Sequence, residues 1–425
     1  MAPELIATAI LIVVIVLFVT EAIPLPLTAV LGALAMAVFG IISFPEAFAG
    51  FSNDILMMVV GMLIIGRAVY ESGLVDRITA ALECLSLRGR SRMSVGVVGA
   101  CAGVLSSIMS NTAVTAAFLP VADSLAKRSQ DGSLRKTLYM AVGGLAVLGG
   151  ALTLIGSTPQ LIVQGVLKNA GLETFGFFTL LKGALPLFAI AIVYFCTVGY
   201  RLLLTTRAEG STESSSPTEP VPERRPPTNF RMYATAIVLV ACIVAFIAGV
   251  WTVGAVAITG ALILIIIRCI DLKAVVHHVD WSSVVVLGGC LGFSKGLEAS
   301  GAGEMLAAGI INLCGGATAH PLPVFAGIVT LAAALSCLVS NTAVAAMLTP
   351  LGIFLAQGMG FPVITMAVGI ALASNICFAT PIGTPPMTLT LSAGYRFTDY
   401  LKVGTPLCIV LVAAVIVLTP LLYGW

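Results

Sequence analysis

The stretch Ser110-Asn111-Thr112-Ala113-Val114 occurs twice in this chain, the second time as Ser340-Asn341-Thr342-Ala343-Val344. A serine precedes each copy by one helical turn, Ser106 in the first and Ser336 in the second. Further short segments recur in the same order: Thr8-Ala9-Ile10 with Thr235-Ala236-Ile237, Gly61 with Gly289, Gly73 with Gly301, Met140-Ala141-Val142-Gly143 with Met366-Ala367-Val368-Gly369, and Leu181-Lys182 with Leu401-Lys402. An ordered series of this kind indicates that the chain consists of two related halves.

The composition places both halves in a membrane. Hydrophobic residues make up 59% of the 425 residues, charged residues make up only 9%, and the mean hydropathy is +1.09. A water-soluble protein of this length needs far more polar surface. The apolar residues fall in continuous blocks of about 20, which suit helices that span the hydrocarbon core and do not suit the alternating strands of a β-barrel. The sequence therefore predicts an all-α polytopic membrane protein.

Each half contains the same series of apolar blocks. The first half has them at residues 4–20, 27–43, 54–70, 136–168 and 178–204. The second half has them at residues 232–250, 253–270, 282–298, 361–394 and 396–423. We therefore expect five transmembrane helices in each repeat.

One more apolar region lies between the third and fourth blocks of each half, at residues 92–127 and 320–358, and it carries the polar triplet. Its arms, 93–108 and 113–126 in the first half, are short for a full span. Irregular backbone at membrane depth is tolerated only where it faces protein or a watery cavity. The pattern predicts one re-entrant helical hairpin in each half, with two ordinary spans joined by a loop as the alternative.

The basic residues indicate how the repeats are inserted. Five spans per repeat is an odd number, so the second repeat is expected to lie upside down relative to the first. If the N-terminus is outside, nearly all Lys and Arg clusters fall in cytoplasmic segments, and only Lys168 and Lys182 fall in outer loops. Residues 206–230, rich in Ser, Thr, Glu and Pro, then form a mobile cytoplasmic linker. We expect a multi-pass protein of the cell (inner) membrane with both termini extracytoplasmic.

The sequence contains no pattern typical of an enzyme: no HExxH, no nucleophile elbow and no phosphate-binding glycine loop. No cofactor and no nucleic-acid partner are expected. The informative residues are uncharged and lie where helices are interrupted. Besides the two triplets, the fourth span of each half is broken by glycine and proline, at residues 149–160 and 379–386.

Four interruptions at similar depth suit an anion and a cation together. Helix N-termini offer free N–H groups to carboxylate or sulfate oxygens, and unwound carbonyls with Ser, Thr and Asn oxygens suit Na⁺. The alternative is that these residues only pack helices. No Asp or Glu lies mid-span near the motifs, which favours Na⁺ over a proton, while exchange without a coupling ion stays open. Arg67 and Glu71 are expected to form a structural pair near a membrane boundary.

These motifs together resemble the divalent anion/sodium symporter family. Thr20-Glu21-Ala22-Ile23-Pro24-Leu25-Pro26 after the first span is similar to a hallmark of that family, as are the two Ser-Asn-Thr triplets. Gly156-Ser157-Thr158-Pro159-Gln160 and Gly383-Thr384-Pro385-Pro386-Met387 resemble its Gly-Thr-Pro-Pro-Asn breaks, with Gln160 and Met387 in place of asparagine. The resemblance covers nearly the whole chain apart from the linker.

The resemblance implies a homodimer in the lipid bilayer that works by an elevator movement. It implies a scaffold part in each repeat, at residues 1–91 and 231–319. It implies a transport part in each repeat, at residues 92–205 and 320–425, which contains the hairpin and the broken helix.

The resemblance also implies the site residues. One Na⁺ site would comprise Ser106, Ser110, Asn111 and the Gly156 carbonyl, and a second would comprise Ser336, Ser340, Asn341 and the Gly383 carbonyl. The dianion would lie between them, in contact with Asn111, Thr112, Ser157, Thr158, Asn341, Thr342, Thr384 and Pro385.

The function predicted from the sequence is Na⁺-coupled symport of a small dianion, with C4-dicarboxylates such as succinate, malate or fumarate first. A dicarboxylate exchanger without Na⁺ coupling, and a sulfate or citrate transporter on the same fold, are the alternatives. The alternative from a different functional class is an ion channel or an intramembrane enzyme.

Overall fold

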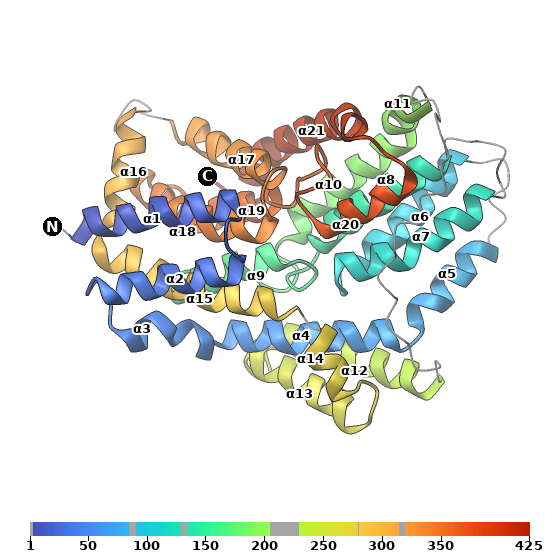
Figure 1. Ribbon diagram of the computed structural model, residues 1–425, viewed down its shortest axis with the longest axis horizontal. Helices are drawn as coiled ribbons and strands as arrows, with labels where there is room; N and C mark the ends of the chain where they lie inside the picture. The colour runs from blue at the N-terminus through green and yellow to red at the C-terminus, as the bar shows by residue number, and fades with distance from the viewer. Residues whose placement is uncertain are drawn as a thin grey trace.

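The computed structural model describes residues 3–84, 91–127, 129, 134–204, 229–278, 280–313 and 320–425, and within them it is built of helices without strands (Figure 1). The first half comprises α1 (Pro3–Thr20), α2 (Leu25–Val38), α3 (Phe44–Phe48), η1 (Ala49–Ser52), α4 (Asp54–Glu71), α5 (Leu74–Cys84), α6 (Ser91–Ser106), α7 (Asn111–Lys127), α8 (Leu134–Gly150), α9 (Thr158–Asn169), α10 (Leu181–Tyr194), η2 (Phe195–Gly199) and α11 (Tyr200–Leu204). The second half comprises α12 (Asn229–Ala248), α13 (Val253–Ile266), α14 (Leu272–His278), α15 (Trp281–Ser300), α16 (Ala302–Leu313), α17 (Pro321–Ser336), α18 (Asn341–Met359), α19 (Val363–Ala373), α20 (Pro385–Leu389), η4 (Thr390–Ala393) and α21 (Phe397–Tyr423).

Short polar side chains and prolines set many of the helix starts. Asn53 accepts a hydrogen bond from the Ile55 N–H at the start of α4, 2.8 Å away, and Thr252 caps α13 in the same manner. The His320 ring nitrogen caps α17, whose first residue is a proline. These caps satisfy N–H groups that have no partner inside the helix, so each helix begins at a defined residue.

The two halves pack against each other reciprocally. Helix α4 packs on α13, and α15 packs on α2. The repeated glycines allow both contacts: a Cβ on Gly61 would lie 2.4 Å from the Ala257 backbone, and a Cβ on Gly289 would lie 2.7 Å from the Ala29 backbone. Since a side chain at either position would meet backbone atoms, the match of Gly61 with Gly289 marks equivalent helix contacts.

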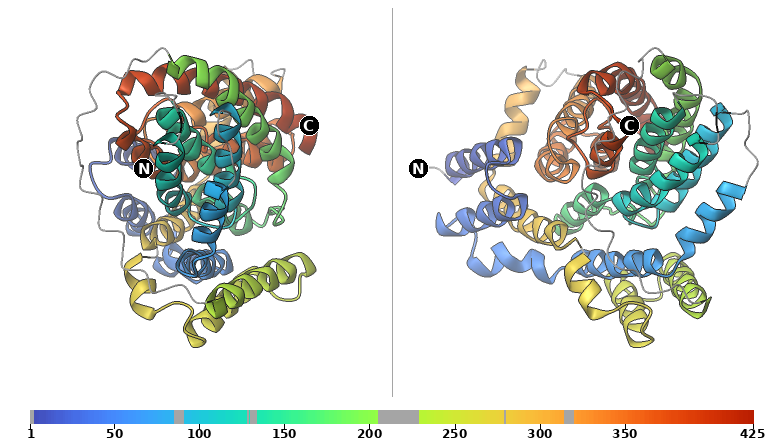
Figure 2. Two further views of the ribbon diagram at one scale, coloured as in Figure 1. Left: turned by 90° about the vertical axis from the view of Figure 1, so that its right-hand side faces the viewer. Right: turned by 45° about the vertical axis from the view of Figure 1, so that its right-hand side comes forward.

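The hairpins and broken helices form a second set of packed elements. Helices α6 and α7 pack on α8, α17 and α18 pack on α19, and α10 packs on α21. In Figure 1 this set lies above α4 and α12–α14. Helix α5 packs on α7 and α16 packs on α18, at opposite sides of the molecule (Figure 2).

Six helical segments in the described residues are long and apolar enough to cross a membrane: 3–20, 44–71, 181–203, 229–248, 341–359 and 397–423. This bears out a polytopic membrane protein, while the count of ten spans stays a prediction. One hairpin arm differs from expectation, because α18 has 19 residues and is itself long enough to span. The predicted linker 206–230 lies outside the described residues, apart from its last two residues, which begin α12.

Both helix breaks exist, but their predicted boundaries are wrong. Helix α8 continues through Gly150, so the first break covers residues 151–157. Gly149 serves close packing instead of unwinding, because its Cβ position would lie 2.1 Å from the Gly103 carbonyl oxygen. The second break begins earlier, at Ser374, where the Asn375 side chain donates to the Ala371 carbonyl at 2.8 Å and helps to end the helix.

Candidate functional site

The two hairpin tips have the same internal geometry. Helix α6 ends at Ser106 and α7 begins at Asn111, and the Ser106 hydroxyl donates to Asn111 Oδ1 at 2.6 Å. In the second hairpin the Ser336 hydroxyl donates to Asn341 Oδ1 at 2.5 Å. Both serines are completely buried. The serine four residues before each triplet therefore orients the asparagine amide. The predicted helical turn between this serine and the triplet is wrong, because α6 and α17 end at Ser106 and Ser336.

Each break lies against the tip of its own hairpin. Thr153 Oγ1 donates to the Ser107 carbonyl in the first repeat, and Thr380 Oγ1 donates to the Cys337 carbonyl in the second. Ser157 and Thr384 have nearly the same extended backbone, with φ of −146° and −148°, directly before the helix that follows each break. The equivalent residues of the two repeats thus bring unwound backbone to the equivalent tips.

Glycine is required where break and tip meet. A Cβ on Gly156 would lie 2.4 Å from the Gly150 carbonyl oxygen and 2.8 Å from the Ser107 carbonyl oxygen. A Cβ on Gly383 would lie 2.3 Å from the Ser336 carbonyl oxygen. Two carbonyl oxygens therefore lie close to Gly156 and one lies close to Gly383, and the Asn111 side-chain oxygen lies beside the neighbouring Gly150. Neutral oxygens gathered in this way are the ligands that a hard monovalent cation accepts.

A central cavity of about 330 Å³ joins the two tips and the two breaks. It is lined by every residue predicted to touch the dianion: Asn111, Thr112, Ser157, Thr158, Asn341, Thr342, Thr384 and Pro385. It is also lined by six of the eight residues predicted for the cation sites, which are the same two asparagines with Ser110, Gly156, Ser340 and Gly383. Ser106 and Ser336 stand behind the wall, bonded to the asparagines. The structure brings the predicted residues together, while their roles as ligands stay a prediction.

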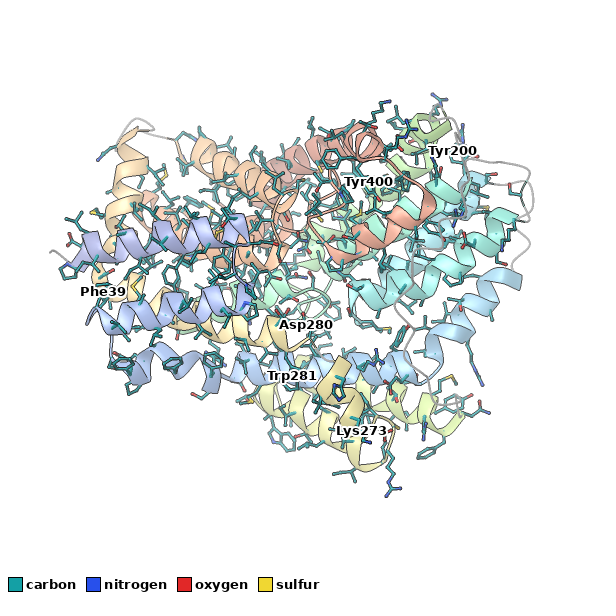
Figure 3. The ribbon with its side chains drawn as sticks, in the orientation of Figure 1. Phe39, Tyr200, Lys273, Asp280, Trp281 and Tyr400 are labelled. Carbon is teal, nitrogen blue, oxygen red and sulfur yellow. The ribbon has the colours of Figure 1, made fainter. Side chains whose placement is uncertain are left out.

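The opposite wall of the cavity contains residues that the sequence analysis missed. Asp280 and Ser283 of the α15 start, and Arg67 and Tyr70 of α4, line it. Asp280 lies near the centre of the molecule in Figure 3 and caps α15, accepting from the Ser283 N–H at 3.2 Å. Asp280 precedes its span in the sequence, so nothing there indicated that α15 begins at the cavity. An acidic group thus lines the cavity from a helix N-cap, although no Asp or Glu lies mid-span near the motifs.

Arg67 and Glu71 form the predicted ion pair, with Nε and Oε1 2.8 Å apart and both side chains largely buried. Their location is not only structural, because Arg67 lines the central cavity. Among the described lining residues it is the one with a positive charge, and Asp280 is the one with a negative charge. The remaining lining is neutral, so an anion in the cavity would be held by hydrogen bonds, with Arg67 as the nearby counter-charge.

The segment from Thr20 to Pro26 connects α1 to α2 and reaches the second tip. Glu21 has a φ of 47°, in the left-handed region that non-glycine residues seldom adopt. Its Oε1 accepts from the Ser340 N–H at 3.4 Å, and Leu25 lines the cavity. Between the two repeats, the hydroxyls of Thr158 in α9 and Ser283 in α15 are 3.5 Å apart. The boundary of the hairpins and breaks with the helices around them also carries the ion pair of Lys168 with Asp54, at 2.8 Å, and the Asn169 amide, which donates to the Leu291 carbonyl at 3.2 Å.

These features together define the class. An all-helical membrane protein with a central cavity between two polar hairpin tips has the architecture of a transporter. The YdaH transporter of Alcanivorax borkumensis shares the fold, with a TM-score of 0.63, 17% identity and coverage of 99% of this chain and 98% of that one. MtrF of Neisseria gonorrhoeae aligns with a TM-score of 0.59 and 13% identity over 89% of this chain and 82% of its own.

The chain belongs to the CitMHS citrate transporter family, whose model matches residues 15–319 and 310–425. An uncharacterized transporter of Haemophilus influenzae is 26% identical over 94% of this chain and 88% of its own length. The sodium-dependent dicarboxylate transporter SdcS of Staphylococcus saprophyticus is 24% identical over 89% of this chain and 78% of its own. The uncharacterized transporter YfbS of Escherichia coli is 30% identical over 157 residues, a quarter (25%) of its length.

The comparisons confirm the family that the motifs indicated. The relatives and the structural neighbours are transporters and not enzymes. The match to SdcS along most of the chain supports a transporter of the divalent anion/sodium symporter type.

Proposed function

We propose that this protein is a secondary active transporter that imports a small dianion together with Na⁺, with a C4-dicarboxylate such as succinate, malate or fumarate as the preferred substrate. The observation that carries the proposal is the single cavity on which both Ser-Asn-Thr triplets and both helix breaks converge. The relative SdcS is a sodium-dependent dicarboxylate transporter, which supports the same substrate class.

The anion would be bound without a dedicated cationic pocket. Helices α7 and α18 begin at Asn111 and Asn341 on the cavity wall, so their first N–H groups and the two amide side chains are available to carboxylate oxygens. The Thr112 and Thr342 hydroxyls stand beside them. A dicarboxylate has one carboxylate for each tip, which is why we favour it over a smaller dianion such as sulfate.

The cations would neutralise the dianion from sites next to the two hairpin tips. One Na⁺ would be held by Ser106, Ser110, Asn111 and the Gly156 carbonyl, and the other by Ser336, Ser340, Asn341 and the Gly383 carbonyl. The carbonyl oxygens close to Gly156 and Gly383 would supply negative potential without a titratable group. Binding of Na⁺ would order each break against its tip and so complete the anion site.

Transport would follow an elevator movement. The helices at residues 92–205 and 320–425 would move as a transport part against a scaffold at residues 1–91 and 231–319, in a homodimer with both termini extracytoplasmic and inverted repeats. The reciprocal contacts α2–α15 and α4–α13 suit a rigid scaffold. The polar contacts across the boundary, among them Glu21 with Ser340 and Lys168 with Asp54, would have to break as the two parts slide.

Uptake of labelled succinate into proteoliposomes tests the proposal. We expect an inward Na⁺ gradient to drive accumulation, and unlabelled malate or fumarate to compete more strongly than citrate or sulfate. If uptake is indifferent to Na⁺ and needs dicarboxylate inside the vesicle, the protein is an exchanger instead. Currents far above carrier turnover would indicate a channel.

A further inference from the structure

Two buried amide side chains connect the helix breaks of the two repeats. Gln160 lies in the first turn of α9, just after the first break, and is completely buried. Its Nε2 donates to the carbonyl oxygens of Gly150 at 2.8 Å and Thr153 at 3.2 Å. Gln160 therefore ties the end of α8 and the first break to the start of α9.

Asn375 is the partner from the second break and is also completely buried. Its Nδ2 donates to Gln160 Oε1 at 3.4 Å and to the Ala371 carbonyl at 2.8 Å, and its Oδ1 accepts from the Ser157 hydroxyl at 2.9 Å. Every polar atom of both amides thus has a partner, which a buried polar network requires if it is to hold a single geometry.

This amide bridge, defined as Gln160 and Asn375, extends to both hairpin tips. On one side Gly150 lies directly against the Asn111 amide, since a Cβ on Gly150 would be 2.4 Å from Asn111 Oδ1. On the other side the carbonyl of Ser374, next to Asn375, lies 2.5 Å from the Ser336 hydroxyl, whose one proton it shares with Asn341 Oδ1. A continuous series of contacts therefore runs from the first triplet to the second.

The second repeat has no equivalent of the bridging glutamine. Met387 stands where Gln160 stands in the first repeat, and a thioether cannot donate to carbonyls. The two repeats are therefore not equivalent at this position, which is the position where Gln160 of the first repeat contacts Asn375 of the second.

We propose that the amide bridge couples the two cation sites, so that occupancy of the site at one break favours occupancy at the other. This inference rests on the proposed function, because it assumes that Na⁺ binds at both breaks. Ordering of the first break around a cation positions Gly150 and Ser157, both of which are bonded to the bridge. The bridge transmits that ordering to Asn375 and Ser374, and hence to the second tip. Gln160 and Asn375 are positioning residues that need not touch the cations.

The chain offers a matched control for the test. Gln164 lies one turn further along α9 and is also buried, but its amide bonds both backbone groups of Phe175, with N–O distances of 3.0 and 2.6 Å, away from the second break. We would compare Gln160→Met, which copies Met387, with Gln164→Met. Asn375→Leu removes the other amide of the bridge. Gln160→Asn keeps an amide at position 160 on a shorter side chain.

The experiment measures succinate uptake as a function of Na⁺ concentration in proteoliposomes. Wild type is expected to respond cooperatively to Na⁺, with a Hill coefficient above unity. In Gln160→Met and Asn375→Leu the coefficient falls toward unity and the half-saturating Na⁺ concentration rises by about fivefold or more, while the KM for succinate at saturating Na⁺ changes little. Gln164→Met keeps the wild-type coefficient, and Gln160→Asn restores part of it.

Three results would count against these ideas in different ways. Wild-type cooperativity in Gln160→Met and Asn375→Leu would overturn the bridge, and so would an equal loss in Gln164→Met, which would indicate a general packing defect. If Gln160→Met does not fold, Asn375→Leu and Gln160→Asn decide the same question. No Na⁺ response in wild-type protein would overturn the proposed function, and the coupling of cation sites would fall with it.

Discussion

Gly156→Ala is the substitution for which the structure supplies the clearest magnitude. Its Cβ would lie 2.4 Å from the Gly150 carbonyl oxygen, whereas real Cβ contacts under 3.0 Å essentially do not occur. Gly156 and the end of α8 must therefore separate by about 0.6 Å, the difference between these two values. The obstructing atoms belong to the backbone and cannot rotate away, so we expect a cost of about 1–3 kcal/mol in the free energy of unfolding.

The same displacement has a larger consequence for cation binding. Ligand oxygens at a metal site must stay within about 0.2 Å of their distances, so a shift of this size removes the Gly156 carbonyl from the proposed first Na⁺ site. We expect the Na⁺ affinity to fall by at least about tenfold. Gly383→Ala is expected to act in the same way on the second site, because its Cβ would lie 2.3 Å from the Ser336 carbonyl oxygen.

Gly327→Ala is the matched control, since a Cβ there meets nothing within 4 Å inside α17. Alanine in a helix interior is favoured over glycine by about 0.5–1 kcal/mol, so this variant should keep wild-type uptake and equal or higher thermal stability. The assay is Na⁺-dependent succinate uptake combined with thermal unfolding in detergent. A wild-type half-saturating Na⁺ concentration in Gly156→Ala, or an equal loss in Gly327→Ala, would refute the reasoning.

Two further sets of variants test the cavity itself. Asn111→Ala and Asn341→Ala should each abolish succinate uptake while expression and dimer formation persist, and Asn111→Ala should cost about 1–3 kcal/mol of unfolding free energy because the buried Ser106 hydroxyl loses its acceptor. Wild-type uptake in either variant would contradict the site. Arg67→Gln should raise the KM for the dianion and destabilise the protein by about 3 kcal/mol, since it leaves the largely buried Glu71 carboxylate unpaired. The double variant Arg67→Gln with Glu71→Gln should recover the stability but not the KM, and recovery of both would assign Arg67 a purely structural role.

The sequence alone determined the class of protein and the framework of the site. The apolar composition left a membrane as the only solvent that suits the chain, and the ordered repeat predicted two equivalent sets of elements. Local chemistry predicted the interruptions: Pro159 and Pro385 cannot continue a preceding helix, and the polar triplets cannot lie in a lipid-exposed span. These are properties of neighbouring residues, so they can be read along the chain.

The tertiary structure decided which of these interruptions meet and what else joins them. Asp280 and Arg67 line the cavity because α15 and α4 pack beside the hairpins. No local feature of the sequence indicates that these helices pack there. The boundaries of the breaks differ from the predicted ones for the same reason. Gly149 packs against Gly103, and Asn375 bonds to Gln160, which is far away in the sequence. Whether a glycine unwinds a helix or a buried amide bridges two repeats depends on the partner across the packing interface, and only the folded chain supplies that partner.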